Sequence, residues 1–480
     1  VAGAQYRMRL SIQGASLMAR TWLASNPEPT TRQVATTDPD LTLPDDVGIR
    51  TLLGSGNTTP ETVPTAPGEP AGEPVGAAAV PLGKGPLLRL MPMLTVANAA
   101  MYMVYMGIGA VLLPLQVEQV DPANKVAAFG LVAGVAAIFA TVFNPLAGVL
   151  SDRSGRRNPW ILGGGLAALG ALALLGQARS VLLVAIGWCL VQATMNIYQA
   201  ALTAVVPDRV PVERRGLASA MVGIGTPIGT AVGISTAAVF VPGDIALGYL
   251  VMGAVVAVAA VLFTAVVRDQ RRPAVRSVPL RGQFRAFAVT LGSADFRWVF
   301  IGRFLMMLGF FAVSLFQIYI LQDHIALPAD LEPEEAVALI APIDAGVTLL
   351  ATVLGGVLSD RTGRRKPLIF VSSALCAVAM LVPVVRPDWT GMLIFTVLIG
   401  LAFGSYLAVD TALVTLVLPS ADDAARDMGV LNVANAGPQI IAPFLASAIV
   451  GSLGYDGLYV IAALITLAGA VSVFFVCDVR

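Results

Sequence analysis

The sequence contains one charged turn twice, and each copy lies between two long apolar runs. The first copy spans 148–161, and the second spans 356–369 with few changes. A cluster of charges at this density is too costly to place in the hydrocarbon core of a bilayer. Each copy must therefore lie at a membrane face between two spanning helices. The duplication indicates that the membrane part consists of two halves of one design.

The composition is typical of a membrane protein. Of the 480 residues, 56% are hydrophobic and 12% are charged, whereas soluble domains carry about 25% charged residues. Apolar runs of about 20 residues, each long enough to cross a bilayer, recur from residue 92 to the C-terminus. We therefore expect an all-α membrane protein.

The apolar runs predict twelve transmembrane helices in two pseudo-symmetric six-helix bundles. The predicted spans lie near 94–117, 126–150, 160–177, 180–205, 217–241, 245–267, 298–321, 336–357, 367–385, 391–418, 428–451 and 455–477. The resulting domains are an N-terminal tail (1–88), a first bundle (89–267), a cytoplasmic linker (268–296) and a second bundle (297–480). We expect the tail to be disordered, because 26–81 is rich in Pro, Thr, Gly and acidic residues and cannot bury a core.

The orientation follows from the distribution of Lys and Arg. On the side of the two turns we count roughly twenty of these residues, against only Lys125, Arg179 and Arg386 on the other side. Because positive charge marks the inner face, we expect both turns and both chain ends to be cytoplasmic in a multi-pass protein of the cell membrane.

Twelve spans in two halves, with G-x-L-S-D-R-x-G-R-R after spans 2 and 8, resemble the major facilitator superfamily. A second signature, 207–216 after span 4, has a counterpart in 419–429 after span 10. The resemblance covers about 89–480. It implies secondary transport by alternating access between the two bundles, with no enzymatic activity and no cofactor.

Two stretches, 144–148 and 428–439, also resemble the glycoside and sucrose-type cation symporters. Span 5 contains 223–233, which is loosely similar to the Gly-Pro motif of drug/proton antiporters but lacks its Gly-Gly end. Small residues in membrane helices usually allow close packing.

The turns themselves predict a gate. Each Asp can accept hydrogen bonds from nearby Arg and from a helix N-terminus, and the arginines can pair with carboxylates across the interface between the halves. The alternative is that the charges only anchor the topology. The residues of this gating motif are Gly148, Asp152, Arg153, Gly155, Arg156, Arg157, Gly356, Asp360, Arg361, Gly363, Arg364 and Arg365.

Ionisable residues inside spans are functional candidates by default. Asp410, on span 10, lies about 13 Å along the helix from Pro419, and Asp344 lies toward the outer half of span 8. Either could bind a coupling proton, because burial favours the protonated carboxyl. Arg303, on span 7, favours snorkelling to the interface over a gate or a carboxylate partner. The only histidine, His324, falls in an outer loop.

A cavity for a polyhydroxy solute needs amide and aromatic side chains. For each candidate alone, a hydrogen bond between helices is the better interpretation. For the set as a whole, we expect some members to face a central cavity. The candidates are Gln116, Gln192, Asn196, Gln199, Gln317, Tyr406, Asn432 and Asn435, with Tyr198, Tyr319 and Gln439 as further members.

Other functions find little support in the sequence. No Walker A motif is present, the three cysteines show no metal-ligand spacing, and no basic patch with interleaved aromatics suggests nucleic acid. We expect a monomer in contact with lipid that takes up a small polar solute, sugar-like or otherwise, with a proton or another cation. An exporter of amphipathic compounds and a non-transporting membrane sensor remain as alternatives.

Overall fold

The computed structural model divides the chain into two compact units, residues 1–77 and 78–480. It describes the backbone of residues 6–13, 16–23, 34–37, 84–211, 214–240, 243–269, 294–363, 365–417 and 424–476. It describes the side chains of residues 87–211, 214–240, 243–269, 295–359, 361–363, 365–410 and 433–476.

The N-terminal unit contains a three-stranded antiparallel sheet in the order β1-β2-β3. Its strands are β1 (Tyr6–Gln13), β2 (Ser16–Leu23) and β3 (Val34–Thr37), and β1 pairs with β2 from Tyr6↔Leu23 to Gln13↔Ser16. These strands lie within the segment for which we expected no regular structure. The signal for β1 is the alternation of Met8, Leu10 and Ile12 with polar residues, which is typical of a strand and precedes the Pro-rich stretch.

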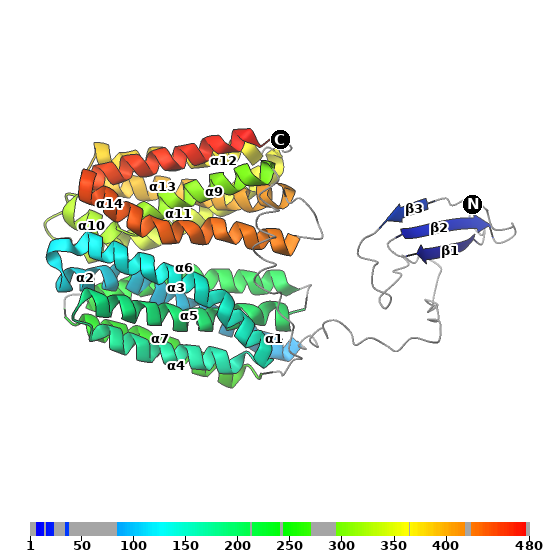
Figure 1. Cartoon of the computed structure of the whole chain (residues 1–480), viewed down its shortest axis with the longest axis horizontal. Coiled ribbons are helices and arrows are strands. Elements are labelled where there is room, and N and C mark those ends of the chain that lie inside the picture. The colour runs from blue at the N-terminus through cyan, green and yellow to red at the C-terminus, as the bar shows by residue number, and fades with distance from the viewer. Residues whose placement is uncertain are drawn as a thin grey trace. The chain divides into compact units, whose positions relative to one another are not determined.

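The second unit begins with the first bundle of helices (Figure 1). The first span comprises α1 (Lys84–Gly107), the π-helical η2 (Ile108–Leu112) and α2 (Leu113–Val120), followed by the short η3 (Pro122–Asn124). The next five spans are α3 (Lys125–Ser154), α4 (Asn158–Gly176), α5 (Val181–Arg209), α6 (Arg215–Phe240) and α7 (Ile245–Val266).

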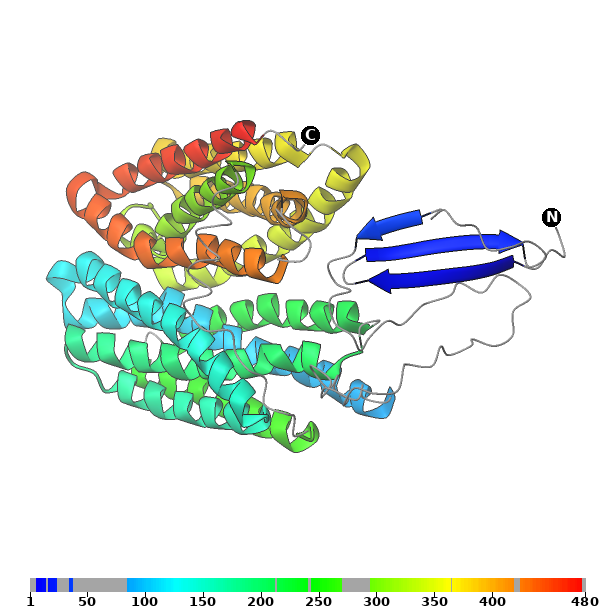
Figure 2. The ribbon, with the colours of Figure 1, turned by 45° about the vertical axis from the view of Figure 1, so that its right-hand side comes forward.

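The second bundle repeats this plan. Its elements are α9 (Ala294–Ser314), α10 (Gln317–Asp323), α11 (Pro333–Thr362), α12 (Arg365–Val385), α13 (Trp389–Val417), α14 (Ala424–Ser472) and the short η5 (Val473–Phe475). The two groups of helices lie side by side in both views (Figures 1 and 2).

The predicted spans are confirmed, with one change at the end of the chain. Eleven helices of the described residues are long and apolar enough to cross a membrane, and the last of these, Val433–Phe475, contains two spans in succession. The two spans within α14 meet at Gly454, whose φ of 72° interrupts the helical backbone. A positive φ is a conformation that glycine adopts at little cost, and Gly454 separates the spans expected at 428–451 and 455–477.

Glycines let the first and fifth spans pack closely. A Cβ added at Gly225 would lie 2.8 Å from the carbonyl oxygen of Thr95, and one at Gly229 would collide with the carbonyl of Ala99. These glycines belong to the span 5 stretch with the antiporter-like pattern. The structure therefore gives this stretch the packing role that small residues have in membrane helices.

Hydrogen bonds and an ion pair join described residues of the two halves on one side. We define the motif side as the face that bears the two charged turns, and the opposite side as the other face. Every hydrogen bond and ion pair that joins described residues of the two halves lies on the opposite side, for example Tyr319 Oη to the carbonyl of Pro114 at 2.7 Å. Toward the motif side, the side chains of Leu150 and Leu358 are 40% and 48% exposed. An added Cβ at Gly148 or Gly356 would meet no atom within 4 Å.

Candidate functional site

Each of the two charged turns ends a helix with a left-handed glycine. The first turn ends α3 with Gly155 at φ 63°, and the second ends α11 with Gly363 at φ 62°. The Gly155 amide donates to the Asp152 carbonyl, and the Gly363 amide donates to the Ser359 carbonyl. A left-handed glycine after a helix is a common way to end it, so the glycines of the motif reverse the chain within a few residues.

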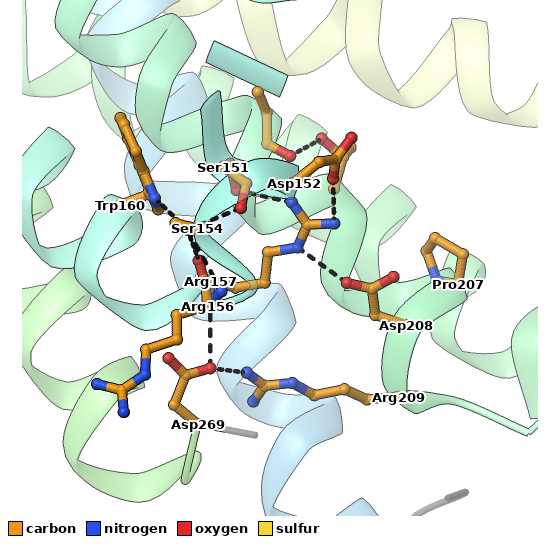
Figure 3. Close-up of polar contacts among 12 residues, drawn as sticks. Ser151, Asp152, Ser154, Arg156, Arg157, Trp160, Pro207, Asp208, Arg209 and Asp269 are labelled. Atoms are coloured by element: carbon orange, nitrogen blue, oxygen red, sulfur yellow. Dashed lines mark hydrogen bonds and ion pairs between the residues drawn. The ribbon is translucent and has the colours of Figure 1, made fainter. Parts of the chain in front are cut away.

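Arg157 is the centre of the first turn (Figure 3). Its guanidinium pairs with Asp152 at the end of α3 and with Asp208 at the end of α5, the latter at 2.9 Å. Its Nη1 also donates to Ser151 Oγ at 2.7 Å. All three partners belong to the first bundle, so Arg157 makes no pair across the halves among the described residues of this structure, and the predicted latch stays a prediction. Arg157 instead joins the ends of α3 and α5.

Asp269 occupies the place at a helix N-terminus that we expected for Asp152. It accepts the backbone amides of Arg157 and Asn158 at the start of α4, each at 3.3 Å. It also accepts from the guanidinium of Arg209 at 2.8 Å (Figure 3). An anion at a helix N-terminus is stabilised by the free amides and the helix dipole. Sequence reasoning missed Asp269 because it directly follows span 6, in the segment that we treated as linker.

The other arginines and the second aspartate of the motif differ in exposure and in whether they are described. Arg153 and Arg156 are exposed in the first turn, and Arg361 is exposed in the second. The side chain of Asp360 and the whole of Arg364 lie outside the described residues, while Arg365 begins α12.

An ion pair lies inside the second bundle. Arg303 Nη1 on α9 is 2.8 Å from Asp410 Oδ2 on α13. Tyr406 Oη donates to Asp410 Oδ1 at 3.1 Å, and Arg303 Nε donates to Asn435 Oδ1 on α14 at 2.9 Å. The snorkelling interpretation of Arg303 is thus replaced by its alternative, a carboxylate partner. Three helices meet at this network, which we call the Arg303 network.

Asp344, the second predicted coupling residue, lies apart from the Arg303 network. Its carboxylate lies against α13, where an added Cβ at Gly400 would be 3.1 Å from Asp344 Oδ1. Thr348, one turn further along α11, donates to the Gly400 carbonyl at 3.4 Å. No cationic side chain among the described residues pairs with Asp344.

The polar residues predicted for the cavity divide into two groups. Gln116 contacts only the first bundle, where it donates to the Leu175 carbonyl at 2.8 Å and accepts from Tyr249 at 2.8 Å. It also lines a cavity of about 300 Å³ between α2, α4 and α7 on the opposite side. Tyr198 likewise joins two helices of its bundle, through the carbonyl of Ala97. These residues hold helices together.

The remaining members are spread over both bundles. On α5, Asn196 accepts from Asn144 at 2.9 Å, Gln199 accepts from Tyr105 at 3.2 Å, and Gln192 Oε1 is buried without a hydrogen-bond partner among the described residues. In the second bundle, Tyr406 and Asn435 belong to the Arg303 network, and Gln317 is half-buried at the start of α10. The side chain of Asn432 lies outside the described residues.

A second charged cluster, which sequence reasoning did not assign, joins the halves on the opposite side. Lys125 Nζ lies 2.9 Å from Glu118 of the first bundle and 2.9 Å from Asp323 of the second. Asp323 also accepts from Tyr455 Oη at 2.8 Å. We call these four residues the Lys125 cluster. Near it, the Arg386 guanidinium and the Gly391 amide hold the pKa of the exposed Asp388 carboxyl below its usual range.

The sequence profile described as Major Facilitator Superfamily matches residues 94–343 and 299–480. The chain belongs to the major facilitator superfamily. The resemblance drawn from the repeated turns is therefore confirmed at the level of the superfamily, and the chain is a multi-pass membrane transporter. No curated protein sequence matches this chain.

Solved structures of other transporters have the same fold as this superfamily member. A POT family transporter in complex with 5-aminolevulinic acid matches with a TM-score of 0.65 at 12% identity, over 79% of this chain and 94% of that chain. The nucleoside transporter NupG matches with 0.65 at 14%, over 80% and 99%. An inward-facing bacterial homolog of the human lysosomal transporter Spinster matches with 0.63 at 16%, over 82% and 95%. At these identities the likeness concerns the fold alone.

Proposed function

We propose that this superfamily member is a proton-coupled symporter of a small polar organic solute, with Asp410 as the proton-binding residue. The observation that carries the proposal is the Arg303–Asp410 ion pair at 2.8 Å within the spans. Burial favours the neutral form of a carboxyl, whereas a neighbouring guanidinium favours the charged form. The protonation of Asp410 is therefore tied to the position of Arg303, and a group with this property can couple a proton to a conformational step.

The Arg303 network joins three helices, which favours coupling between proton binding and helix movement. Arg303, Asp410 and Asn435 lie on three different spans of one bundle. Protonation of Asp410 removes the charge attraction between α9 and α13, while the hydrogen bond from Arg303 to Asn435 keeps α9 attached to α14. A local proton transfer thereby changes how the helices of the second bundle are held together, as a switch requires.

We infer alternating access from the contacts on the two sides of the molecule. The Lys125 cluster joins the halves on the opposite side, while Leu150 and Leu358 are exposed toward the motif side. We infer that the motif side is cytoplasmic, in agreement with the positive-inside rule, and that this conformer is open to the cytoplasm. Arg157 and Asp269 hold the motif ends of the first bundle together, so that the bundle can move as a body.

The solute is proposed to be a small polar compound, sugar-like or otherwise. Gln192, Gln199 and Asn435 supply amide groups within the spans. The structural neighbours include a transporter in complex with 5-aminolevulinic acid, a peptide transporter and a nucleoside transporter. The resemblance of 144–148 and 428–439 to glycoside and sucrose-type cation symporters supports the same class.

The experiment is uptake into proteoliposomes of the full chain. Labelled sugars, glycosides, nucleosides, peptides and organic acids are offered with and without an imposed pH gradient, acidic outside. We expect at least one solute to accumulate above its outside concentration only when the gradient is present. An Asp410→Asn variant should lose this accumulation and retain exchange of labelled for unlabelled solute.

Two results would contradict the proposal. Accumulation by Asp410→Asn equal to that of the unchanged chain would exclude Asp410 as the coupling residue. If the solute moves only outward, driven by protons that enter down their gradient, the protein is a proton-driven exporter and not a symporter.

A further inference from the structure

The guanidinium of Arg303 has one donor edge that the protein does not use. Nη1 faces Asp410 at 2.8 Å, and Nε donates to Asn435 at 2.9 Å. Nη2 has no hydrogen-bond partner among the described residues, and the side chain is 14% exposed. Arginine presents five N–H donors in a rigid fork, which matches carboxylate geometry. The unused edge is therefore a preformed donor site on a residue of the proposed coupling network.

Few other charged groups can balance Arg303. The groups that face the Asp410 carboxyl are Arg303 from α9 and Tyr406 from α13. The neighbouring helix α12 brings Cys376 toward Tyr406, and α14 brings the uncharged Asn435 to Arg303. Asp344 lies against Gly400, which is about 15 Å along α13 from Asp410 by helical rise. Asp410 is thus the only carboxylate among the described residues that pairs with Arg303.

Protonation of Asp410 therefore leaves a cation that needs a new partner. Arginine stays charged at all physiological pH values, and an uncompensated charge away from water is costly. A solute anion that binds the free edge of Arg303 would remove this cost. A cationic solute would be repelled by Arg303, and a neutral solute would leave its charge unbalanced.

We propose that the solute carries a carboxylate, which binds the Nη2 edge of Arg303 while Asp410 is protonated. This inference rests on the proposed proton coupling at Asp410. The proton moves from water to the Asp410 carboxylate, and no covalent bond forms or breaks in the solute. For a monocarboxylate, one proton and one negative charge cross together, so transport is electroneutral. The solute carboxylate and the proton each favour binding of the other. Protonation of Asp410 removes the negative charge next to Arg303, and the solute carboxylate replaces it.

The first test measures binding by the purified full chain in detergent. An Asp410→Asn variant mimics the protonated state, because the amide has nearly the shape of the acid and no charge. The probes are acetate, lactate and gluconate, each compared with its own primary amide at equal ionic strength, and the readout is the midpoint of thermal unfolding. We expect at least one of these acids to stabilise Asp410→Asn, with its amide roughly tenfold weaker because a charge-assisted hydrogen bond is lost.

Further variants tie the effect to Arg303. The stabilisation should disappear in the double variant Arg303→Gln/Asp410→Asn. It should persist in Arg386→Gln/Asp410→Asn, which removes an exposed arginine that is paired with Asp388 instead. If all the acids act no better than their amides, or if they act equally without Arg303, the carboxylate site is excluded. Unfolded double variants would be detected by size-exclusion chromatography, and in that case Arg303→Lys, which keeps the charge but loses the fork, replaces Arg303→Gln.

The second test separates this inference from the proposed function. Proteoliposomes are assayed with an imposed pH gradient and, separately, with an imposed membrane potential. Uphill uptake of a neutral sugar that depends on Asp410 would contradict the carboxylate and leave proton coupling in place. Carboxylate binding that depends on Arg303 without any flux driven by the pH gradient would contradict proton coupling and leave the binding site in place. Uptake of a monocarboxylate that responds to the pH gradient but not to the potential is the result expected if both hold.

Discussion

The ammonium nitrogen of Lys125 lies 2.9 Å from a carboxylate oxygen of Asp323, so a residue at the start of span 2 is paired with one at the end of span 7. The same nitrogen lies 5.0 Å from the ring centre of Tyr319, which is within the range of a cation–π interaction. Both contacts cross the boundary between the two bundles. They must therefore separate whenever the opposite side opens.

A Lys125→Gln substitution should weaken the closure on the opposite side. The side chains of Lys125 and Asp323 are 16% and 34% exposed, and a partly exposed pair is worth roughly 0.2–1 kcal/mol. We expect up to roughly a fivefold shift toward the state that is open on the opposite side. The measurement is the rate at which an impermeant maleimide labels a cysteine placed at Ser447, which packs against Gly130 of the other half. Arg386→Gln serves as the control, since its pair lies within one bundle, and equal labelling in both variants would exclude the role of Lys125.

An Asp152→Asn substitution should slow transport without reducing the amount of protein in the membrane. It removes one of the two carboxylates that pair with Arg157 and leaves Asp208 in place. A loss of roughly 1 kcal/mol from this pair corresponds to about a fivefold lower rate. Uptake is measured per molecule of transporter in proteoliposomes. Arg153→Gln, which changes an exposed residue of the same turn, should keep its rate, and an unchanged rate for Asp152→Asn would limit the turn to anchoring.

A Gly229→Ala substitution should destabilise the first bundle. The added Cβ would collide with the Ala99 carbonyl on α1, and overpacking of this kind costs roughly 1–3 kcal/mol. Gly223 is a matched control on the same helix, because a Cβ added there meets no atom within 4 Å. The midpoints of thermal unfolding in detergent should therefore fall for Gly229→Ala and stay level or rise for Gly223→Ala. The opposite order would show that α1 and α6 do not pack as described.

An Asp344→Asn substitution should retain accumulation of solute against its gradient. Asp344 pairs with no arginine or lysine among the described residues, so its neutralisation releases no cation, unlike that of Asp410. The test is uphill uptake in parallel with Asp410→Asn. Loss of accumulation in Asp344→Asn with retained exchange would transfer the coupling role to Asp344.

The sequence was sufficient to predict the spans and their ends, because the membrane restricts where charged residues can lie. Charged residues cannot remain in lipid, so the turn around Asp152 marks a helix end without any knowledge of tertiary structure. The boundary between the last two spans was predicted at 452–454, where Gly454 lies. In contrast, the strands of residues 6–37 were missed, because the composition of 26–81 dominated the interpretation of the whole N-terminal segment.

The site could be predicted only as a set of residue types. Asp410 was recognised because a carboxylate within a span is rare, but its pairing with Arg303 depends on how α9 and α13 are rotated about their axes. That rotation follows from packing between helices distant in sequence, which periodicity alone does not specify. For the same reason, Gln116 was expected in the central cavity and lies instead among helices of the first bundle.

The short link between spans 11 and 12 at Gly454 has a mechanical consequence. Spans 11 and 12 are separate helices that are joined through the non-helical Gly454, and Tyr455, which holds Asp323, comes directly after this bend. Because this connection is so short, a tilt of span 11 also moves Tyr455, which holds Asp323. Span 11, which carries Asn435, therefore ends next to the Lys125 cluster between the bundles. A movement at the Arg303 network can reach the Lys125 cluster through this one helix.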